Sequence, residues 1–136
     1  PKLISEFLDE TSTIEDRYFY DSRFKITKKL KEDMEDPATL YQWRRVYTRA
    51  NKNNQCPTLT ANMGTGGHNV PLVLVDKKKK TIRKLTPKEC FRFQGYGNVN
   101  LPKGIIDSQL YKQAGNSVTV SLIRIQAKMI KDVLVL

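Results

Sequence analysis

The sequence has few of the residues that build metal sites and disulfide frameworks. It contains two cysteines, Cys56 and Cys90, and one histidine, His68. Two thiols outside a Cys-x-x-Cys pair are too few for a disulfide framework, so we expect free thiols in a reducing cytoplasm. A zinc site would need all three of these side chains, which lie far apart along the chain, and we therefore expect no metal centre.

Long apolar runs are also missing. No stretch approaches the ~18 consecutive apolar residues of a membrane helix, and residues 1–6 lack the apolar region of a signal peptide. We therefore expect no membrane association. Internal repeats and Gly/Ser linkers are absent, and 136 residues suffice for about one domain. The first residue is not methionine, and we expect a fragment of a longer protein.

Positive charge is what the chain has in excess. Lysine and arginine number 24 against 14 acidic residues, which gives a formal net charge of +10. A charge of this size on a short chain favours a polyanionic partner, with nucleic acid the first candidate. The alternative at this point is a basic surface that serves only solubility.

The pattern of apolar residues predicts short helices and strands in alternation. We expect a helix over residues 2–10, a second charged helix over residues 25–36, and between them an aromatic and charged segment, residues 16–24. Lysines 77–80 form the expected tip of a β-hairpin. The predicted strands cover residues 41–49, 57–61, 71–75 and 81–85.

One helix carries clear start and stop signals. Thr86, Pro87 and Glu89 form a capping box with proline in the first turn, and Gly95 marks the end. Cys90 lies on the apolar side of this helix and is expected to be a buried structural thiol. After a loop over residues 97–106, we expect Asp107 or Ser108 to cap a short helical turn that Gly115 closes.

The last predicted helix opens at Asn116–Ser117 and is apolar over a wide arc. Because such a helix must lie between two layers, we expect a larger domain or a second chain to cover it, or self-association through residues 120–134. Its two apolar stripes consist of Val120, Ile123, Ala127, Ile130 and Leu134, and of Leu122, Ile125, Met129, Val133 and Leu136.

Three segments carry longer patterns than periodicity explains. Residues 83–96 read Arg-Lys-Leu-Thr-Pro-Lys-Glu-Cys-Phe-Arg-Phe-Gln-Gly-Tyr, and residues 108–118 read Ser-Gln-Leu-Tyr-Lys-Gln-Ala-Gly-Asn-Ser-Val. They resemble the ninth and tenth conserved motifs of the cytosine-C5 DNA methyltransferases, in the family's order. Residues 56–69, which begin Cys-Pro-Thr-Leu-Thr-Ala-Asn, are similar to the target-recognition region of bacterial members. The resemblance covers residues 41–126 well.

Other motifs of that family are missing. The nucleophilic cysteine of the family follows proline, whereas Cys56 follows Gln55 and Cys90 follows Glu89. The Glu-Asn-Val triplet, the Gly-rich cofactor motif and the Gln-x-Arg-x-Arg motif are absent as well. The resemblance thus implies the C-terminal third of such an enzyme, with no catalytic residue of its own and with S-adenosylmethionine bound mainly outside this chain.

The resemblance also implies which residues contact DNA and cofactor. Arginine can read guanine, and glutamine or asparagine can read adenine, in the major groove. A solvated strand face is the alternative for the arginines. Asn116 and Ser117 would touch the S-adenosylmethionine pocket from the start of the last helix. The expected DNA-binding residues are Gln42, Arg44, Arg45, Tyr47, Arg49, Thr58, Thr60, Asn62, Gly64 and Gly66.

We therefore expect an α+β fold that recognises double-stranded DNA within a cytosine-C5 methyltransferase of a prokaryotic nucleoid. The chain would be a fragment, or the small subunit of a split enzyme, with the N-terminal catalytic domain or subunit as partner. A non-catalytic DNA- or RNA-binding module and an interaction domain that docks its last helix are the alternatives. The expected divisions are a lead-in over 1–40, a recognition domain over 41–106, and a catalytic-domain segment over 107–136 that would pack on a Rossmann-like domain.

Overall fold

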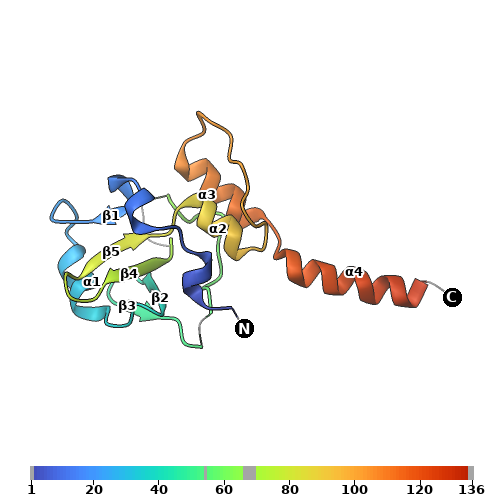
Figure 1. The fold of residues 1–136 in the computed structure, drawn as a ribbon, viewed down its shortest axis with the longest axis horizontal. Helices are drawn as coiled ribbons and strands as arrows, with labels where there is room; N and C mark the ends of the chain where they lie inside the picture. Colours follow the sequence, from blue (N-terminus) through green and yellow to red (C-terminus); the bar gives the residue numbers. More distant parts are fainter. Residues whose placement is uncertain (1, 54, 66–69, 135–136) are drawn as a thin grey trace.

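One antiparallel sheet organises the computed structural model, which describes residues 2–53, 55–65 and 70–134 (Figure 1). Its strand order is β1-β5-β4-β2-β3. The sheet and its helices confirm the α+β class. The strands are β1 (Phe19–Tyr20), β2 (Leu40–Trp43), β3 (Thr48–Ala50), β4 (Leu72–Asp76) and β5 (Thr81–Lys84). The helices are α1 (Thr27–Asp33), α2 (Pro87–Phe93), α3 (Asp107–Asn116) and α4 (Val120–Leu134), and 3-10 turns span Ile4–Phe7, Thr11–Thr13 and Asp16–Tyr18.

The sheet buries both of its faces. Successive side chains of a strand point to opposite faces, and in β4 Leu72 and Leu74 join one core while Val73 joins the other. The first of these cores includes Leu30 of α1, and the second includes Tyr111 of α3. The two-sided burial explains why β4 reads as a continuous apolar run rather than an alternating one.

The structure places residues 1–40 within this unit rather than ahead of it. Ile4 and Tyr18 are buried in the same core as Leu85 and Cys90. The strand β1 adds an edge to the sheet by pairing with β5. The expected boundary near residue 40 is therefore not a boundary in packing, because the lead-in contributes to both cores and to the sheet.

Several local predictions are confirmed. The predicted hairpin over residues 71–85 forms β4 and β5, with the lysines at its tip. The Thr86 side chain accepts a hydrogen bond from the Glu89 backbone at 3.2 Å, and the Glu89 carboxylate accepts one from the Thr86 backbone at 2.8 Å. Gly95 follows α2 with φ +91°.

Other local predictions are wrong. The first helix is only the 3-10 turn Ile4–Phe7, and residues 57–61 form no strand. Residues 41–49 divide into β2 and β3 around a tight turn. Neither Asp107 nor Ser108 caps α3, whose N-cap residue is Ile106, and α3 continues through Gly115.

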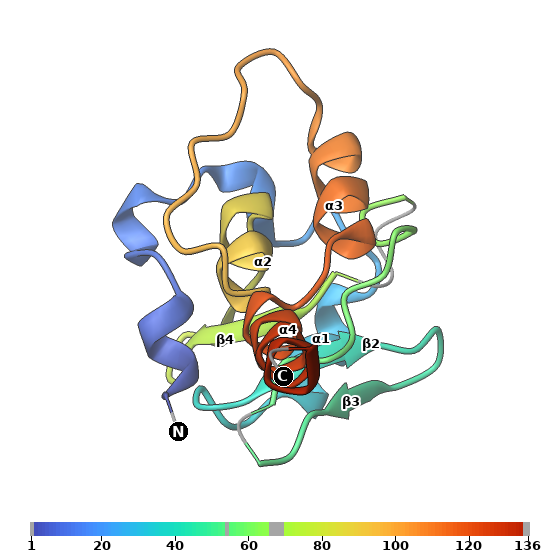
Figure 2. The same cartoon turned by 90° about the vertical axis from the view of Figure 1, so that its right-hand side faces the viewer.

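The helix α4 leaves the rest of the fold. Figure 1 shows it projecting from the body beyond the ends of α2 and α3, and Figure 2 looks nearly along it. None of its described residues is buried, and Met129 is 63% exposed. Among the described residues, no helix has the length and apolar character to cross a membrane.

Candidate nucleic-acid interface

The turn between β2 and β3 presents arginines to solvent. Arg44 donates its backbone N–H to the Tyr47 carbonyl at 2.8 Å, and Val46 donates to the Arg44 carbonyl at 2.8 Å. Arg45 takes the left-handed conformation, φ 65°, between them. The side chains of Arg44, Arg45 and Tyr47 are exposed, whereas Trp43 directly before them is buried. The strand pair thus anchors the turn through Trp43, and the guanidinium groups of Arg44 and Arg45 have no hydrogen-bond or ion-pair partner among the described residues.

Two expected contact residues of this hairpin have other surroundings. Gln42 is only 6% exposed, because it lies inside β2 between the two buried aromatic residues Tyr41 and Trp43. Arg49 is exposed on β3 but donates from Nε and Nη2 to Asn51 Oδ1, at 3.3 and 3.1 Å. Arg44, Arg45 and Tyr47 are therefore the expected contact residues of this hairpin that are exposed and make no side-chain hydrogen bond among the described residues.

A second group of expected residues lies on a loop, residues 55–65, which we call the recognition loop. Leu59 and Met63 are buried and anchor it, while Thr58, Thr60 and Asn62 are exposed. Thr60 Oγ1 donates to Asn62 Oδ1 at 2.6 Å, which holds the two side chains together. The recognition loop therefore offers alternating polar side chains from a fixed backbone.

Glycine sets how closely this loop approaches α3. Gly64 has φ +82°, and a Cβ there would collide with the Tyr111 ring. A Cβ on Gly115 would overlap the backbone of Thr60 and Ala61. The recognition loop and the end of α3 are thus in direct contact. Gly66, another expected contact residue, and His68 lie outside the described residues.

Asn116 and Ser117 lie at the C-terminal end of α3, and the expectation that they open the last helix is wrong. Ser117 donates its backbone N–H to Gln113 O at 3.0 Å and its Oγ to Ala114 O at 2.6 Å. These bonds close α3, and α4 begins only at Val120. The free N–H groups and positive dipole of a helix start are therefore not available at Asn116 and Ser117.

A cavity of about 520 Å³ lies between the recognition loop and the end of α3. Thr58, Gln94 and Ser117 are among its lining residues. Gln94 joins three elements there: Nε2 donates to Ala114 O at 3.2 Å, Oε1 accepts from Thr119 Oγ1 at 2.8 Å, and its carbonyl accepts from Val120 N at 2.9 Å. The sequence analysis did not predict this role of Gln94, because no local sequence pattern indicates that a side-chain amide will bond to segments far away along the chain.

Both thiols are unsuited to nucleophilic attack. Cys90 is fully buried, and desolvation raises its pKa well above the usual value. Burial raises the pKa of Cys56 to about 12. Both groups are therefore protonated at neutral pH, while a nucleophile needs the thiolate. The prediction that Cys90 is a buried structural thiol is confirmed.

A buried ion pair connects β5 with α2. Arg83 Nη1 and Nη2 donate to Glu89 Oε2 and Oε1 at 2.8 and 2.7 Å, and both side chains are almost fully buried. Glu89 Oε1 also accepts from the backbone of Asp9 at 2.8 Å. This pair ties β5, α2 and the N-terminal segment together. The capping-box pattern predicted the bond of Glu89 to the start of α2, but no sequence pattern predicted its ion pair with Arg83.

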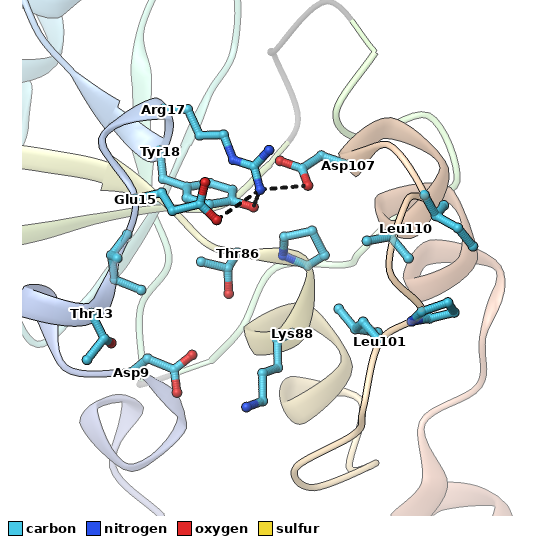
Figure 3. Close-up of a pocket in the computed structure, with 14 residues that line it drawn as sticks. Asp9, Thr13, Glu15, Arg17, Tyr18, Thr86, Lys88, Leu101, Asp107 and Leu110 are labelled. Atoms are coloured by element: carbon cyan, nitrogen blue, oxygen red, sulfur yellow. Dashed lines mark hydrogen bonds and ion pairs between the residues drawn. The ribbon is translucent and has the colours of Figure 1, made fainter.

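A further cavity, of about 440 Å³, lies between the N-terminal segment and α3 (Figure 3). Arg17 Nη2 lies 3.2 Å from Glu15 Oε1 and 3.5 Å from Asp107 Oδ1, and it donates to the Tyr18 hydroxyl at 3.2 Å. Opposite charges within the cavity thus neutralise one another. No group of three or more potential metal ligands occurs among the residues that the structure describes.

Comparison with known proteins gives a family match over nearly the whole chain. The family model of the C-5 cytosine-specific DNA methylases matches residues 2–132. The chain is 52% identical over 122 residues to the type II methyltransferase M.Bsp6I of Bacillus sp. (strain RFL6). The aligned part covers 89% of this chain and 38% of that relative.

Two further relatives are more distant. The orphan methyltransferase M.SPBetaI of Bacillus phage SPbeta is 40% identical over 103 residues, 73% of this chain and 23% of the relative. The type II methyltransferase M1.ScrFI of Lactococcus lactis subsp. cremoris is 30% identical over 133 residues, 97% of this chain and 31% of the relative. The chain therefore spans well under half the length of these relatives.

Proposed function

Because this chain belongs to the C-5 cytosine-specific DNA methylase family, we propose that it recognises the DNA target within a DNA (cytosine-5-)-methyltransferase. The whole enzyme would transfer a methyl group from S-adenosylmethionine to C5 of a cytosine, at the nucleoid of a prokaryotic cell. This chain would supply target recognition, and the nucleophile would come from the rest of the enzyme, since the half-buried Cys56 and the buried Cys90 both have raised pKa values and are protonated at neutral pH.

The observation that carries this proposal is the exposed arginine turn between β2 and β3. The side chains of Arg44 and Arg45 are exposed to solvent and belong to neither core. Guanidinium groups of this kind can donate two hydrogen bonds to guanine O6 and N7. Thr58, Thr60 and Asn62 of the recognition loop would add contacts to phosphates and base edges. The net charge of +10 supports the attraction to a polyanion.

The end of α3 fits one wall of a cofactor pocket. Ser117 keeps acceptor capacity on Oγ, and the described hydrogen bonds leave the exposed Asn116 side chain free. The negative end of a helix dipole favours positive groups, and S-adenosylmethionine carries a sulfonium and an ammonium. Asn116 and Ser117 would hold the cofactor from this side, and the cofactor would supply the methyl group. The remaining walls would come from outside this chain.

The uncovered helix α4 supports a partner that completes the enzyme. Its apolar side chains are exposed on every side, and the chain spans 38% of the length of M.Bsp6I. A catalytic domain of the same polypeptide, or a separate catalytic subunit, would cover this helix. In either arrangement α4 would pack on the catalytic part, whereas α3 contributes Tyr111 and Ala114 to the core of the present unit.

A binding assay on the full chain tests DNA recognition. We expect affinity for mixed-sequence duplex DNA that falls steeply with salt, with a slope of about −0.9 in log K against log salt for each phosphate neutralised. Arg45→Ala should weaken specific binding by about 1–3 kcal/mol if Arg45 reads a base. Lys79→Ala removes one charge at the hairpin tip and serves as the matched control. Equal losses in the two variants, with unchanged sequence preference, would contradict base reading by Arg45.

A methyl-transfer assay tests the division of labour. The chain alone, mixed with labelled S-adenosylmethionine and duplex DNA, should give no label on cytosine C5. Label should appear when the portion of M.Bsp6I that this chain does not match is added, because that portion would supply the missing chemistry. Methylation by the chain alone, lost in Cys90→Ser, would overturn the proposal that catalysis lies elsewhere.

A further inference from the structure

A cavity of about 470 Å³ opens between the recognition loop and the aromatic segment around β1. Gly64 of the recognition loop forms part of its lining, and β1 forms another part. Its charged lining residues are all basic, and its remaining lining is mostly aromatic. Of the described DNA-contact residues proposed above, Gly64 is the one that lines this cavity. The cationic residues of the lining are Arg17, Arg23, Lys25 and Lys84.

Among the cations that line this cavity, Lys84 is half-buried, whereas Arg17, Arg23 and Lys25 are exposed. Arg17 pairs with Glu15 and Asp107, and Arg23 pairs with Asp21 at 2.7 Å. The half-buried Lys84 takes part in none of the ion pairs among the described residues. Its Nζ lies 5.7 Å from the centre of the Tyr18 ring and 5.8 Å from that of Tyr111. An ammonium held over two aromatic rings without a carboxylate is suited to receive an anion.

The electrostatics of Lys84 agree with this geometry. Desolvation by burial lowers the pKa of Lys84, and the nearby Arg17 lowers it too, while Asp107 raises it. Burial therefore leaves the ammonium less stabilised than in water. A bound anion would restore the lost stabilisation, because an opposite charge at close range favours the charged form.

An exposed aromatic surface lies beside these cations. Phe24 is 41% exposed, although it is a large apolar residue. Its ring centre lies 5.1 Å from that of Tyr20 with the planes at 57°, and this contact holds the Phe24 ring from one side. Aromatic side chains of this kind stack on nucleobases with little sequence preference.

We propose that this cavity binds one nucleotide of a DNA strand next to the recognition loop, with Lys84 contacting its phosphate and Phe24 stacking on its base. This inference rests on the proposed function, because that function identifies the bound strand as DNA. The cavity's volume lies within the range of about 300–1,000 Å³ that small-molecule sites occupy. This contact would extend the DNA interface beyond the arginine turn, to the segment over residues 16–24.

Binding of the full chain to a mixed-sequence duplex separates this contact from general attraction. Lys84→Gln should weaken binding at least about threefold more than Lys128→Gln and make the salt slope shallower by about 0.9. Lys128→Gln makes the same change of charge on α4, which projects from the body on the side away from β1 (Figure 1). Phe24→Leu should weaken binding at least about fivefold and leave the salt slope unchanged. Lys84→Arg, which keeps the charge, should retain the affinity.

Circular dichroism and thermal melting of each variant establish that it remains folded. The cavity inference is overturned if folded Lys84→Gln and Lys128→Gln bind alike and Phe24→Leu matches the unsubstituted chain. If only Arg45→Ala then weakened DNA binding, the proposed function would still stand and the cavity inference alone would fail.

Titration with small ligands decides the source of the nucleotide. Deoxycytidine monophosphate should bind more weakly than duplex DNA and compete with it, and its binding should fall in Lys84→Gln. Deoxycytidine and inorganic phosphate, each lacking one half of the contact, should bind more weakly still. Tighter binding of the free monophosphate than of DNA would overturn the assignment to a DNA strand.

Discussion

Glu89 combines several structural contacts in one buried carboxylate. It accepts from both terminal nitrogens of Arg83, from the backbone of Thr86 and from the backbone of Asp9. Removing one partner of a buried pair leaves the other charge without compensation, which costs more than the pair itself contributes. The stability of α2 and of the N-terminal segment therefore depends on this side chain.

Glu89→Ala should lower the free energy of unfolding by about 3–5 kcal/mol, because Arg83 would remain buried and unpaired. Urea denaturation measures the change. Glu32→Ala, on the exposed side of α1, is the control and should stay within about 0.5 kcal/mol. The double variant Arg83→Met with Glu89→Leu should recover much of the loss. A cost for Glu89→Ala no larger than that of Glu32→Ala would contradict the importance of this pair.

Gly115→Ala should destabilise the protein, although alanine is ordinarily the better helix former by about 1 kcal/mol. The added Cβ would overlap the Thr60 backbone, and relieving that overlap should cost about 1–3 kcal/mol. Hydrogen exchange should show reduced protection of Met63, whose N–H donates to Thr60 O. Lys112→Ala, on the exposed side of α3, is the control. A stabilising Gly115→Ala would show that the loop moves away at no cost.

Single residues were predictable where the cause of their position is local. The capping box at Thr86 and the glycine after α2 follow from bonds that close within one helical turn. The pairing of Arg83 with Glu89 and the bonds of Gln94 to α3 and α4 depend on tertiary packing. The burial of Gln42 has the same origin, since it follows from the position of β2 within the sheet.

The helix α4 shows what one element does without a partner. Its apolar residues were predicted to need a cover, and from Ser121 to Leu134 its side chains are exposed. Helices of ~12–15 residues are marginal in water without tertiary packing. The chain nevertheless fixes the first residue of α4, because Val120 donates to the Gln94 carbonyl.

Removal of α4 should affect association more than folding. A chain ending at Ser121 keeps the bonds of Gln94, so its free energy of unfolding should match that of the full chain within about 0.5 kcal/mol. Light scattering should show self-association of the full chain through residues 122–134 and a monomer for the shortened one. A full-length monomer whose residues 122–134 resist hydrogen exchange would contradict this expectation, since the helix would then have found a cover within its own chain.

Strands were predictable where hydrophobic pattern and turn signals agreed. Residues 71–85 combine apolar runs with a polar tip and form β4 and β5 as expected. Residues 57–61 also read as a short β-type run, but they contact the end of α3, and the bond from Met63 N to Thr60 O turns the backbone there. The close approach to Gly115, which excludes a neighbouring strand, is a long-range effect that a short sequence window does not contain.

The whole molecule should lose stability at alkaline pH. Burial raises the pKa of Cys56 to about 12 and raises those of Cys90, Tyr18 and Tyr111 as well. A group whose pKa is higher in the folded state contributes stability below its unfolded pKa and loses that contribution as pH rises. The unfolded chain releases thiol protons from about pH 9, so stability should fall above that pH by about 1.4 kcal/mol per pH unit for each such thiol.

Urea denaturation at about pH 7, pH 9 and pH 10 checks this dependence. Cys56→Ser removes one titrating thiol and should make the decline above pH 9 shallower, whatever it does to stability at neutral pH. An identical decline in the two proteins would show that Cys56 titrates normally in the folded state.

The placement of the recognition side chains has a consequence for evolution. Leu59 and Met63 hold the recognition loop in the core, while Thr58, Thr60 and Asn62 alternate with them and face outward. Substitutions at the outward positions change what the loop can bind without opening a cavity or leaving a buried charge unpaired. Under the proposed function, a lineage would therefore acquire a new target sequence through changes that selection for a folded protein does not oppose.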